Sequence, residues 1–174
     1  AYPFTFRKNT ANEVNFANYD MVQTEISWSR NSAMFSPVNI PVINLFNEYF
    51  GGGMAGVVFQ TIRESKALAY STYAYYGTAY KKNEPNIMKA YVGCQADKMN
   101  ESILSMQELL DSLPFSEKLF SVTKASLENN FATSRTLKQP ILFKFLEAQR
   151  LGISYNTRKK TYQLLDKFTF DDLK

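Results

Sequence analysis

The chain has 174 residues, 45% of them hydrophobic, and these values predict one globular domain with a single substantial core. It has no histidine and a single cysteine, Cys94, which excludes Ser-His-Asp and Cys-His catalytic sites, an internal disulfide and a cysteine zinc site. We therefore expect Cys94 to be a buried, unreactive thiol. No stretch is apolar over the roughly 18 residues of a membrane span, so we expect either a soluble domain or a targeting segment that lies outside this sequence, and the compartment stays open.

The formal net charge of +4 makes nucleic-acid binding a function to weigh. The basic residues are scattered, and their short runs are Lys81-Lys82 in an expected turn and Arg158-Lys159-Lys160 on an expected helix. Such runs usually lie on solvated faces, and no recognition motif accompanies them. We therefore expect no nucleic-acid partner.

Residues 1–50 predict an irregular segment, a strand and a helix. Residues 1–20 show little periodicity and predict an irregular lead-in, whereas residues 21–174 predict a single domain. Val22, Thr24, Ile26 and Trp28 alternate with polar residues, which predicts a half-buried strand over 21–30. Apolar residues then recur at helical spacing from Val38 to Tyr49, and the glycines that follow predict a helix end near Phe50.

The next segment predicts a short helix and a hairpin. A helical pattern runs from Met54 to Glu64, and strand patterns over 70–80 and 87–95 flank a turn at 81–86. The tyrosines of this hairpin invite a ligand-stacking interpretation, but cross-strand packing is favoured because such pairs stabilise hairpins directly. These tyrosines are Tyr73, Tyr75, Tyr76, Tyr80 and Tyr91.

Everything after Asp97 has a helical pattern. The predicted helices cover 99–113, 116–135, a segment from Pro140 with Ile141, Leu142, Phe145 and Leu146 on its apolar face, and 156–167. Thr169 to Asp172 resembles the capped start of another helix, so we expect the domain to be truncated at its C-terminus. The order of elements predicts an α+β fold, in which helices pack on one face of an antiparallel-rich sheet.

Gly51, Gly53 and Gly56 match the G-x-G-x-x-G pattern of dinucleotide-binding folds. That fold needs a strand to lead into the first glycine, whereas a helical pattern leads into this one. A helix end with a tight connection is the favoured interpretation. A nucleotide-binding module is kept as an alternative, which predicts that nucleotides protect the chain against thermal unfolding.

The run FNEYFGGGMAGVVFQTIRESKALAYS, residues 46–71, is more specific than its glycines. It resembles the signature of the non-catalytic half of insulinase/pitrilysin-type zinc metallopeptidases, the family that includes the mitochondrial processing peptidase. Matching positions are Phe59, Ile62, Arg63, Ala69 and Tyr70, and the later hairpin and helices extend the resemblance over most of residues 21–173. The resemblance implies the architecture of one insulinase-like half of such a peptidase.

The resemblance also implies where the metal is bound. The family's zinc site is a His-x-x-Glu-His helix with a distal glutamate, which belong to the other half of the molecule, and nothing in this chain can replace them. We therefore expect no metal site and no residue of zinc catalysis in this chain, with zinc in a partner half. The implied partners are that catalytic half, in the same polypeptide or in another subunit, and a peptide substrate.

By position, Arg63 and Tyr70 correspond to the Arg and Tyr that this half of the family presents to bound peptide, with the same seven-residue spacing. A guanidinium offers several fixed donors to backbone carbonyls, and a phenol can donate to a developing oxyanion. The alternative is that Arg63 ends a helix and Tyr70 is a half-buried strand aromatic. Glu64 has no partner carboxylate at an evident spacing and is interpreted as a surface charge.

Two functions follow from the resemblance. The first is a substrate-binding, non-catalytic domain of a zinc metalloendopeptidase, which helps to enclose and position peptides for hydrolysis by the zinc-bearing half. The second is an assembly domain of a catalytically inactive pseudo-peptidase. A His-x-x-Glu-His helix elsewhere in the polypeptide or in a co-purifying subunit would favour the enzyme.

Overall fold

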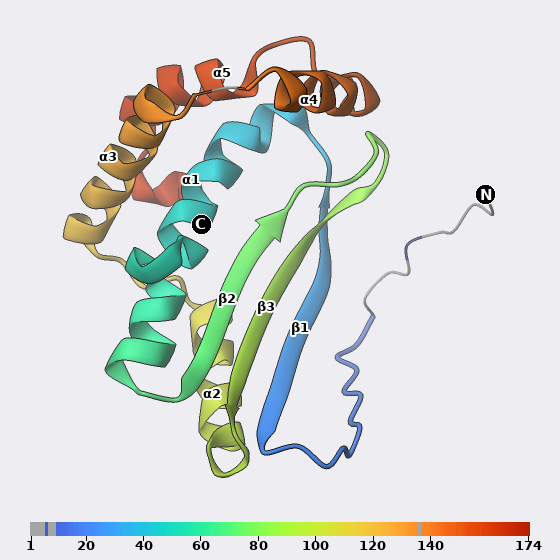
Figure 1. Ribbon diagram of the computed structural model, residues 1–174, viewed down its shortest axis with the longest axis vertical. Helices are drawn as coiled ribbons and strands as arrows, with labels where there is room; N and C mark the ends of the chain where they lie inside the picture. Colours follow the sequence, from blue (N-terminus) through green and yellow to red (C-terminus); the bar gives the residue numbers. More distant parts are fainter. Residues whose placement is uncertain (1–5, 7–9, 136) are drawn as a thin grey trace.

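The structure is built on a three-stranded antiparallel sheet (Figure 1). Its strands are β1 (Gln23–Met34), β2 (Ala69–Gly77) and β3 (Pro85–Gln95), in the order β1-β3-β2. Since β3 is antiparallel to both neighbours, β1 and β2 run in the same direction on either side of it. The computed structural model describes residue 6, residues 10–135 and residues 137–174.

The two faces of the sheet differ in composition, as the period-two pattern of the first strand predicts. On the inner face, Ile26 pairs with Val92 and Trp28 with Ala90, and all four belong to the hydrophobic core or pack against it. Cys94 lies on the same face and is fully buried, as expected. The sequence therefore places one apolar surface on the sheet, against which helices can pack.

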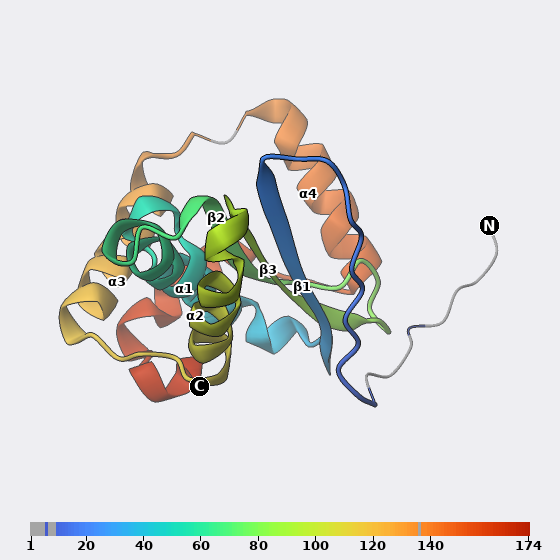
Figure 2. The ribbon, with the colours of Figure 1, turned by 90° about the horizontal axis from the view of Figure 1, so that it is seen from below.

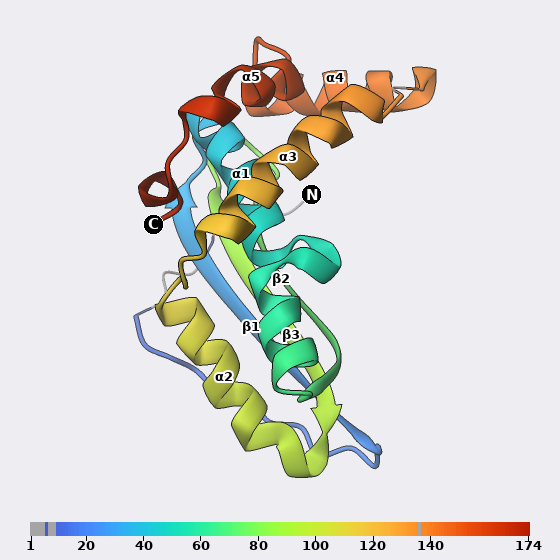
Figure 3. The ribbon, with the colours of Figure 1, turned by 90° about the vertical axis from the view of Figure 1, so that its left-hand side faces the viewer.

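Helices cover this inner face in two layers, which confirms the predicted α+β class, and Figure 2 shows α1, α2 and α3 together on one side of the strands (Figures 1, 2 and 3). Helix α1 (Ile40–Gly51) and helix α2 (Met99–Asp111) pack on the sheet, while α3 (Glu117–Thr133) and α5 (Thr157–Leu164) pack on α1. The side chain of Ser116 accepts a hydrogen bond from the backbone of Leu119 and so caps α3. The core formed between these elements includes Leu45, Tyr49, Phe50, Ile62, Val92 and Met106.

Helix α4 (Lys138–Leu151) lies outside these layers, beyond the end of the sheet where β2 turns into β3 (Figures 1 and 3). The left-handed residue Gly152 follows the helix and caps its C-terminal end. Its last residue, Leu151, is buried in a small second cluster with Phe35, Ile40 and Ala79. The predicted apolar face of this helix does not enter the core: Ile141, Leu142, Phe145 and Leu146 are all exposed.

Short helical segments complete the chain, and they account for most differences from the predicted elements. The helix expected over 54–64 is instead a 3-10 turn followed by a wider helix with π-type hydrogen bonds, because extended Gly56 separates the two. The last predicted helix gives way to 3-10 turns after Leu164. The segments are η1 (Pro37–Asn39), η2 (Gly53–Ala55), η3 (Phe59–Ser65), η4 (Ala96–Lys98), η5 (Leu165–Lys167) and η6 (Phe170–Leu173).

The hairpin is confirmed, with two corrections to its ends. β2 stops at Gly77, not at residue 80, and β3 begins at Pro85 rather than at residue 87. The carboxamide oxygen of buried Asn86 accepts a hydrogen bond from the backbone of Ala79 at 3.0 Å. This side chain takes the place of a ladder bond and so fixes the wider turn.

Candidate functional site

Arg63 lies in the last turn of η3. Its neighbour Ile62 is fully buried and anchors this helix in the core, whereas Arg63 itself is exposed. The guanidinium of Arg63 lies over the ring of Phe59, 5.0 Å from the ring centroid. The side chain is thus exposed and partly held in place by an aromatic ring.

Tyr70 occupies an irregular position in β2. Ala69 pairs with Cys94 and Ser71 with Gly93, so two steps along β2 correspond to one step along β3. Tyr70 is the extra residue of a β-bulge, a feature that re-aims a side chain and is over-represented near active sites. Its side chain is 53% exposed.

The hydroxyl of Tyr70 has one defined partner. The side-chain amide of Gln95, at the end of β3, donates a hydrogen bond to this oxygen at 2.6 Å. Because the phenol oxygen is the acceptor, its own proton can still be donated to another group. Gln95 was not among the residues that sequence reasoning selected, although the pairing of the hairpin places it near the start of β2.

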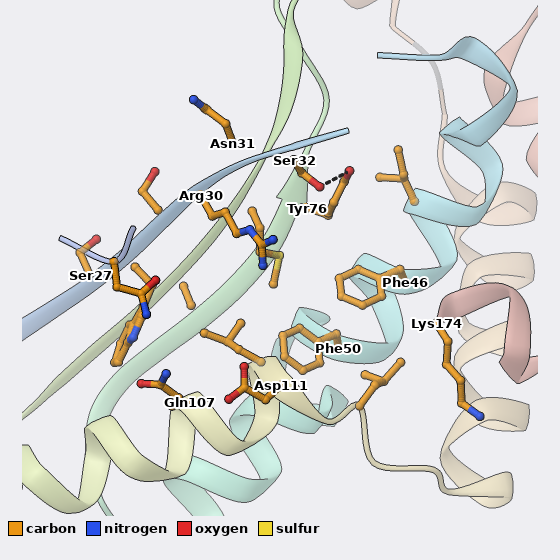
Figure 4. A pocket seen from close by; sticks show the side chains of 18 of the residues that line it. Ser27, Arg30, Asn31, Ser32, Phe46, Phe50, Tyr76, Gln107, Asp111 and Lys174 are labelled. Carbon is orange, nitrogen blue, oxygen red and sulfur yellow. Dashed lines mark hydrogen bonds between the residues drawn. The ribbon is translucent and has the colours of Figure 1, made fainter. Parts of the chain in front are cut away.

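The expected tyrosine cluster divides between the two faces of the sheet. Tyr73 and Tyr91 are paired across the strands on the outer face and stack at 5.1 Å between ring centroids, which confirms the cross-strand packing. Tyr75 lies beside Tyr73, with 6.1 Å between their ring centroids. Tyr76 points to the inner face, where its hydroxyl donates to Ser32 (Figure 4). The outer-face tyrosines therefore continue the exposed surface on which Tyr70 lies.

The glycines close a tight junction between α1 and β2. A Cβ atom on Gly51 would lie 1.7 Å from the carbonyl oxygen of Ala74, and one on Gly56 would lie 2.6 Å from the backbone nitrogen of Gly52. Helix α1, not a strand, leads into the first glycine. The geometry is that of a helix end packed against a strand, and it lacks the strand-to-glycine entry of a dinucleotide site.

A broad groove lies on the inner face beside β1, with a volume of about 1560 Å3. Phe46 and Phe50 of α1 and Gln107 and Asp111 of α2 line it, and residues of β1 such as Arg30 line it from the sheet (Figure 4). Neither Arg63 nor Tyr70 lines this groove. The exposed site at the start of β2 and the groove are separate features of the molecule.

The donor atoms of the chain do not suit zinc. The sequence has no histidine, and its one cysteine is buried in the core. Among residues 6, 10–135 and 137–174, no group of three or more Cys, Asp or Glu side chains could hold a metal ion. In the same part of the chain, no helix combines the length and apolar character needed to cross a bilayer. Arg63 and Tyr70 offer hydrogen-bond donors and an aromatic surface.

Comparison with known proteins identifies the relatives of this chain. Residues 1–127 match the model of the peptidase M16 inactive domain. The uncharacterized zinc protease YmxG of Bacillus subtilis is 33% identical over 86 residues, which are 49% of this chain and 19% of YmxG. The chain thus spans about a fifth of this relative.

Solved structures share the fold. The peptidase M16 inactive domain from Pseudomonas fluorescens superposes with a TM-score of 0.72 at 14% identity, over 89% of this chain and 37% of the other. An inactive peptidase domain from Bordetella parapertussis gives 0.62 at 14% identity, over 92% of this chain and 86% of the other. The resemblance drawn from residues 46–71 is thereby confirmed, and the chain belongs to the family of peptidase M16 inactive domains.

Proposed function

We propose that this chain is the substrate-binding, non-catalytic domain of a zinc metalloendopeptidase. In this proposal the domain helps to enclose a peptide and positions it for hydrolysis by a separate half, in the same polypeptide or in a partner subunit, which holds the zinc. The family membership and the zinc protease among the relatives support the parent activity. The absence of histidine from the chain supports the division of labour.

The observation that carries the proposal is the exposure of Arg63 and Tyr70, together with the bulge at Tyr70. A residue that only fills a strand position needs no bulge, because regular pairing already alternates the side chains between the faces. At Tyr70 an extra residue interrupts the ladder, and Gln95 holds the hydroxyl from one side. Such a side chain is suited to donate a hydrogen bond outward.

The two residues have different roles in the proposal. The guanidinium of Arg63 donates to backbone carbonyls of the bound peptide and so fixes its register. The hydroxyl of Tyr70 donates to the carbonyl oxygen of the scissile bond as negative charge develops there. The first interaction exists with bound substrate and in the transition state alike, whereas the second strengthens only in the transition state.

These roles predict distinct kinetic effects in the full-length protein. We expect Tyr70→Phe to lower kcat by about 100-fold with little change in KM, as for loss of one oxyanion donor. We expect Arg63→Ala to raise KM and to lower kcat/KM by about tenfold or more. Arg63→Lys should retain part of the activity, because lysine keeps the positive charge but lacks the planar set of donors. Steady-state hydrolysis of a fluorogenic peptide measures all three variants.

Tyr80→Phe is the matched control for the phenol. Tyr80 is 62% exposed and lies just after the opposite end of β2. We expect this variant to keep wild-type kcat and KM. Unchanged kcat/KM in both Tyr70→Phe and Arg63→Ala would remove the assignment, and an inactive wild-type polypeptide would favour the assembly domain of a pseudo-peptidase.

A further inference from the structure

We infer that helix α4 is an interaction surface and that a groove encloses it. This groove has apolar walls and an acidic rim, and it lies elsewhere in the polypeptide that carries this chain. This inference is independent of the substrate-binding role of Arg63 and Tyr70. The exposed apolar side chains of α4 contribute nothing to the core formed by the described residues. Phe145, for example, is 57% exposed.

The exposed apolar residues of α4 form a stripe. With about 100° per residue along a helix, Ile141, Leu142, Phe145 and Leu146 fall within an arc of about 140°. A stripe of this kind normally faces a protein core. Here α4 lies at one end of the molecule, beyond the turn between β2 and β3 (Figure 1), and its stripe is exposed; large exposed patches of this kind mark interaction sites.

The remainder of α4 shows what shape the partner has. Phe143 is 61% exposed and lies about 130° around the helix from the middle of the stripe. A flat bilayer can bury one side of a helix, but it leaves such a residue in water. A helix with apolar residues on well-separated sides is one that protein surrounds. The distribution therefore favours a protein groove over a membrane surface.

The positive charge on and around α4 indicates which residues border that groove. Residues 135–160 hold seven basic residues and one acidic residue, a formal charge of +6, which leaves −2 on the rest of a chain whose net charge is +4. On α4 the charged residues are Lys138, Lys144, Arg150 and Glu147. Two copies of such a surface would repel each other, whereas carboxylates at the rim of a groove would attract it.

Arg150 shows how α4 is held for this contact. Its guanidinium lies 3.6 Å from the ring centroid of Tyr80 and donates to the backbone oxygen of Tyr80 at 2.6 Å. Leu151 is buried in the small cluster beneath it. The C-terminal end of the helix is thus fixed to the hairpin, while the exposed stripe lies about one to two and a half turns earlier in the helix.

The lengths of the relatives bear on where such a groove lies. This chain spans 37% of the chain of the Pseudomonas fluorescens structure and 19% of YmxG, so the fold occurs beside further polypeptide in both. A groove within the same polypeptide has a high effective concentration and needs no strong intrinsic affinity. A groove in the rest of the parent polypeptide therefore needs less affinity to enclose α4 than one in a separate partner does.

Thiol reactivity in the full-length polypeptide tests the inference. Leu142→Cys and Phe145→Cys report on the stripe, Phe143→Cys reports on the other side of α4, and Leu104→Cys on α2, where the leucine is 71% exposed, is the matched control. We expect N-ethylmaleimide to modify the three α4 thiols about tenfold or more slowly than the control, because modification requires local opening. Mass spectrometry of the peptide that carries each thiol measures the rates.

Every other pattern of reactivity contradicts the inference. Equal rates at all four positions would show that α4 is uncovered. Protection of only Leu142→Cys and Phe145→Cys that requires phosphatidylserine vesicles would identify a bilayer. Protection that disappears on dilution, together with the mass of a dimer, would identify a second copy.

Carbodiimide cross-linking tests the acidic rim directly. We expect the Lys144 amine to be joined to an Asp or Glu of the same polypeptide that lies outside residues 1–174. We also expect Lys144→Glu to speed the modification of Phe145→Cys about tenfold, while Lys98→Glu, on η4, leaves the rate unchanged. The absence of any such cross-link, with an unchanged rate in Lys144→Glu, would exclude the acidic rim.

Discussion

Tyr49 shows how a single polar group is accommodated in the core. Its side chain is fully buried, and its hydroxyl donates to the carbonyl of Pro114 at 2.8 Å and accepts from the backbone nitrogen of Ser116 at 3.0 Å. Burial raises the pKa of Tyr49 and so keeps the phenol neutral, although the hydrogen bond from Ser116 acts in the opposite direction. Through these bonds one side chain of α1 fixes the connection between α2 and α3.

Removing this hydroxyl should destabilise the fold. We expect Tyr49→Phe to lower the free energy of unfolding by about 1–3 kcal/mol, because it leaves a backbone donor and acceptor without their partner. Urea unfolding followed by circular dichroism measures the change. Tyr162→Phe, at a tyrosine that is 50% exposed, is the control and should stay within about 0.5 kcal/mol of wild type. A loss below that value for Tyr49→Phe would show that water replaces the hydroxyl.

Asp172 gives the closing segment η6 a dependence on pH. Its carboxylate accepts hydrogen bonds from the backbone nitrogen and the hydroxyl of Thr169, at 2.7 and 2.9 Å, and these bonds lower the pKa of Asp172 from its ordinary value of 3.8. Because the pKa of this carboxyl is lower in the folded state than in the unfolded state, its ionised form stabilises the fold. This stability is present at a pH above the unfolded-state pKa and is lost as the pH falls through the folded-state pKa. We therefore expect η6 to loosen below about pH 4.

Amide exchange of residues 170–174 between about pH 5 and pH 2 follows this loosening, after correction for the intrinsic exchange rates. Asp172→Asn should remove the pH dependence. Asp171→Asn, which disrupts only an exposed ion pair with Lys174, should keep it. The same pH profile in wild type and Asp172→Asn would show that another group controls the segment.

At the scale of elements, the junction between α1 and β2 is the least tolerant of change. We expect Gly51→Ala to cost about 3 kcal/mol or more, because the added Cβ would overlap the carbonyl oxygen of Ala74 and neither backbone can retreat. Gly53→Ala is the control: it meets no atom within 4 Å, but its φ of +56° should cost about 1 kcal/mol. Thermal melts measure both variants, and a similar Tm for the two would show that α1 shifts freely along the sheet.

Local patterns predicted most of the elements correctly, and the exceptions have physical reasons. Alternation predicted β1, and apolar spacing predicted helices such as α1 and α2, because each pattern faces a single core. The bulge at Tyr70 left no sign in the sequence, since an extra residue between alternating neighbours is visible only in the pairing with β3. The exposure of α4 was equally hidden, because an apolar stripe has the same spacing whether its cover lies inside or outside the chain.

At the scale of the whole molecule, the sequence alone predicted that helices would pack on one face of the sheet, but not the position of β1. The hairpin of β2 and β3 followed from a short turn, whereas the pairing of β1 with β3 joins segments about 60 residues apart and is decided by the complete core. Prediction of the candidate site from the sequence was limited in the same way. Arg63 and Tyr70 came from a resemblance over a short segment, whereas Gln95 required the register of the sheet.

The order β1-β3-β2 also affects how the protein is made. During synthesis β1 emerges first, but its neighbour in the sheet is β3, the last of the three strands. The nascent β1 must therefore wait, with its backbone groups unpaired, while more than fifty further residues are added. A ribosome that pauses between β2 and β3 would prolong this interval and leave an open strand available to chaperones or to neighbouring nascent chains.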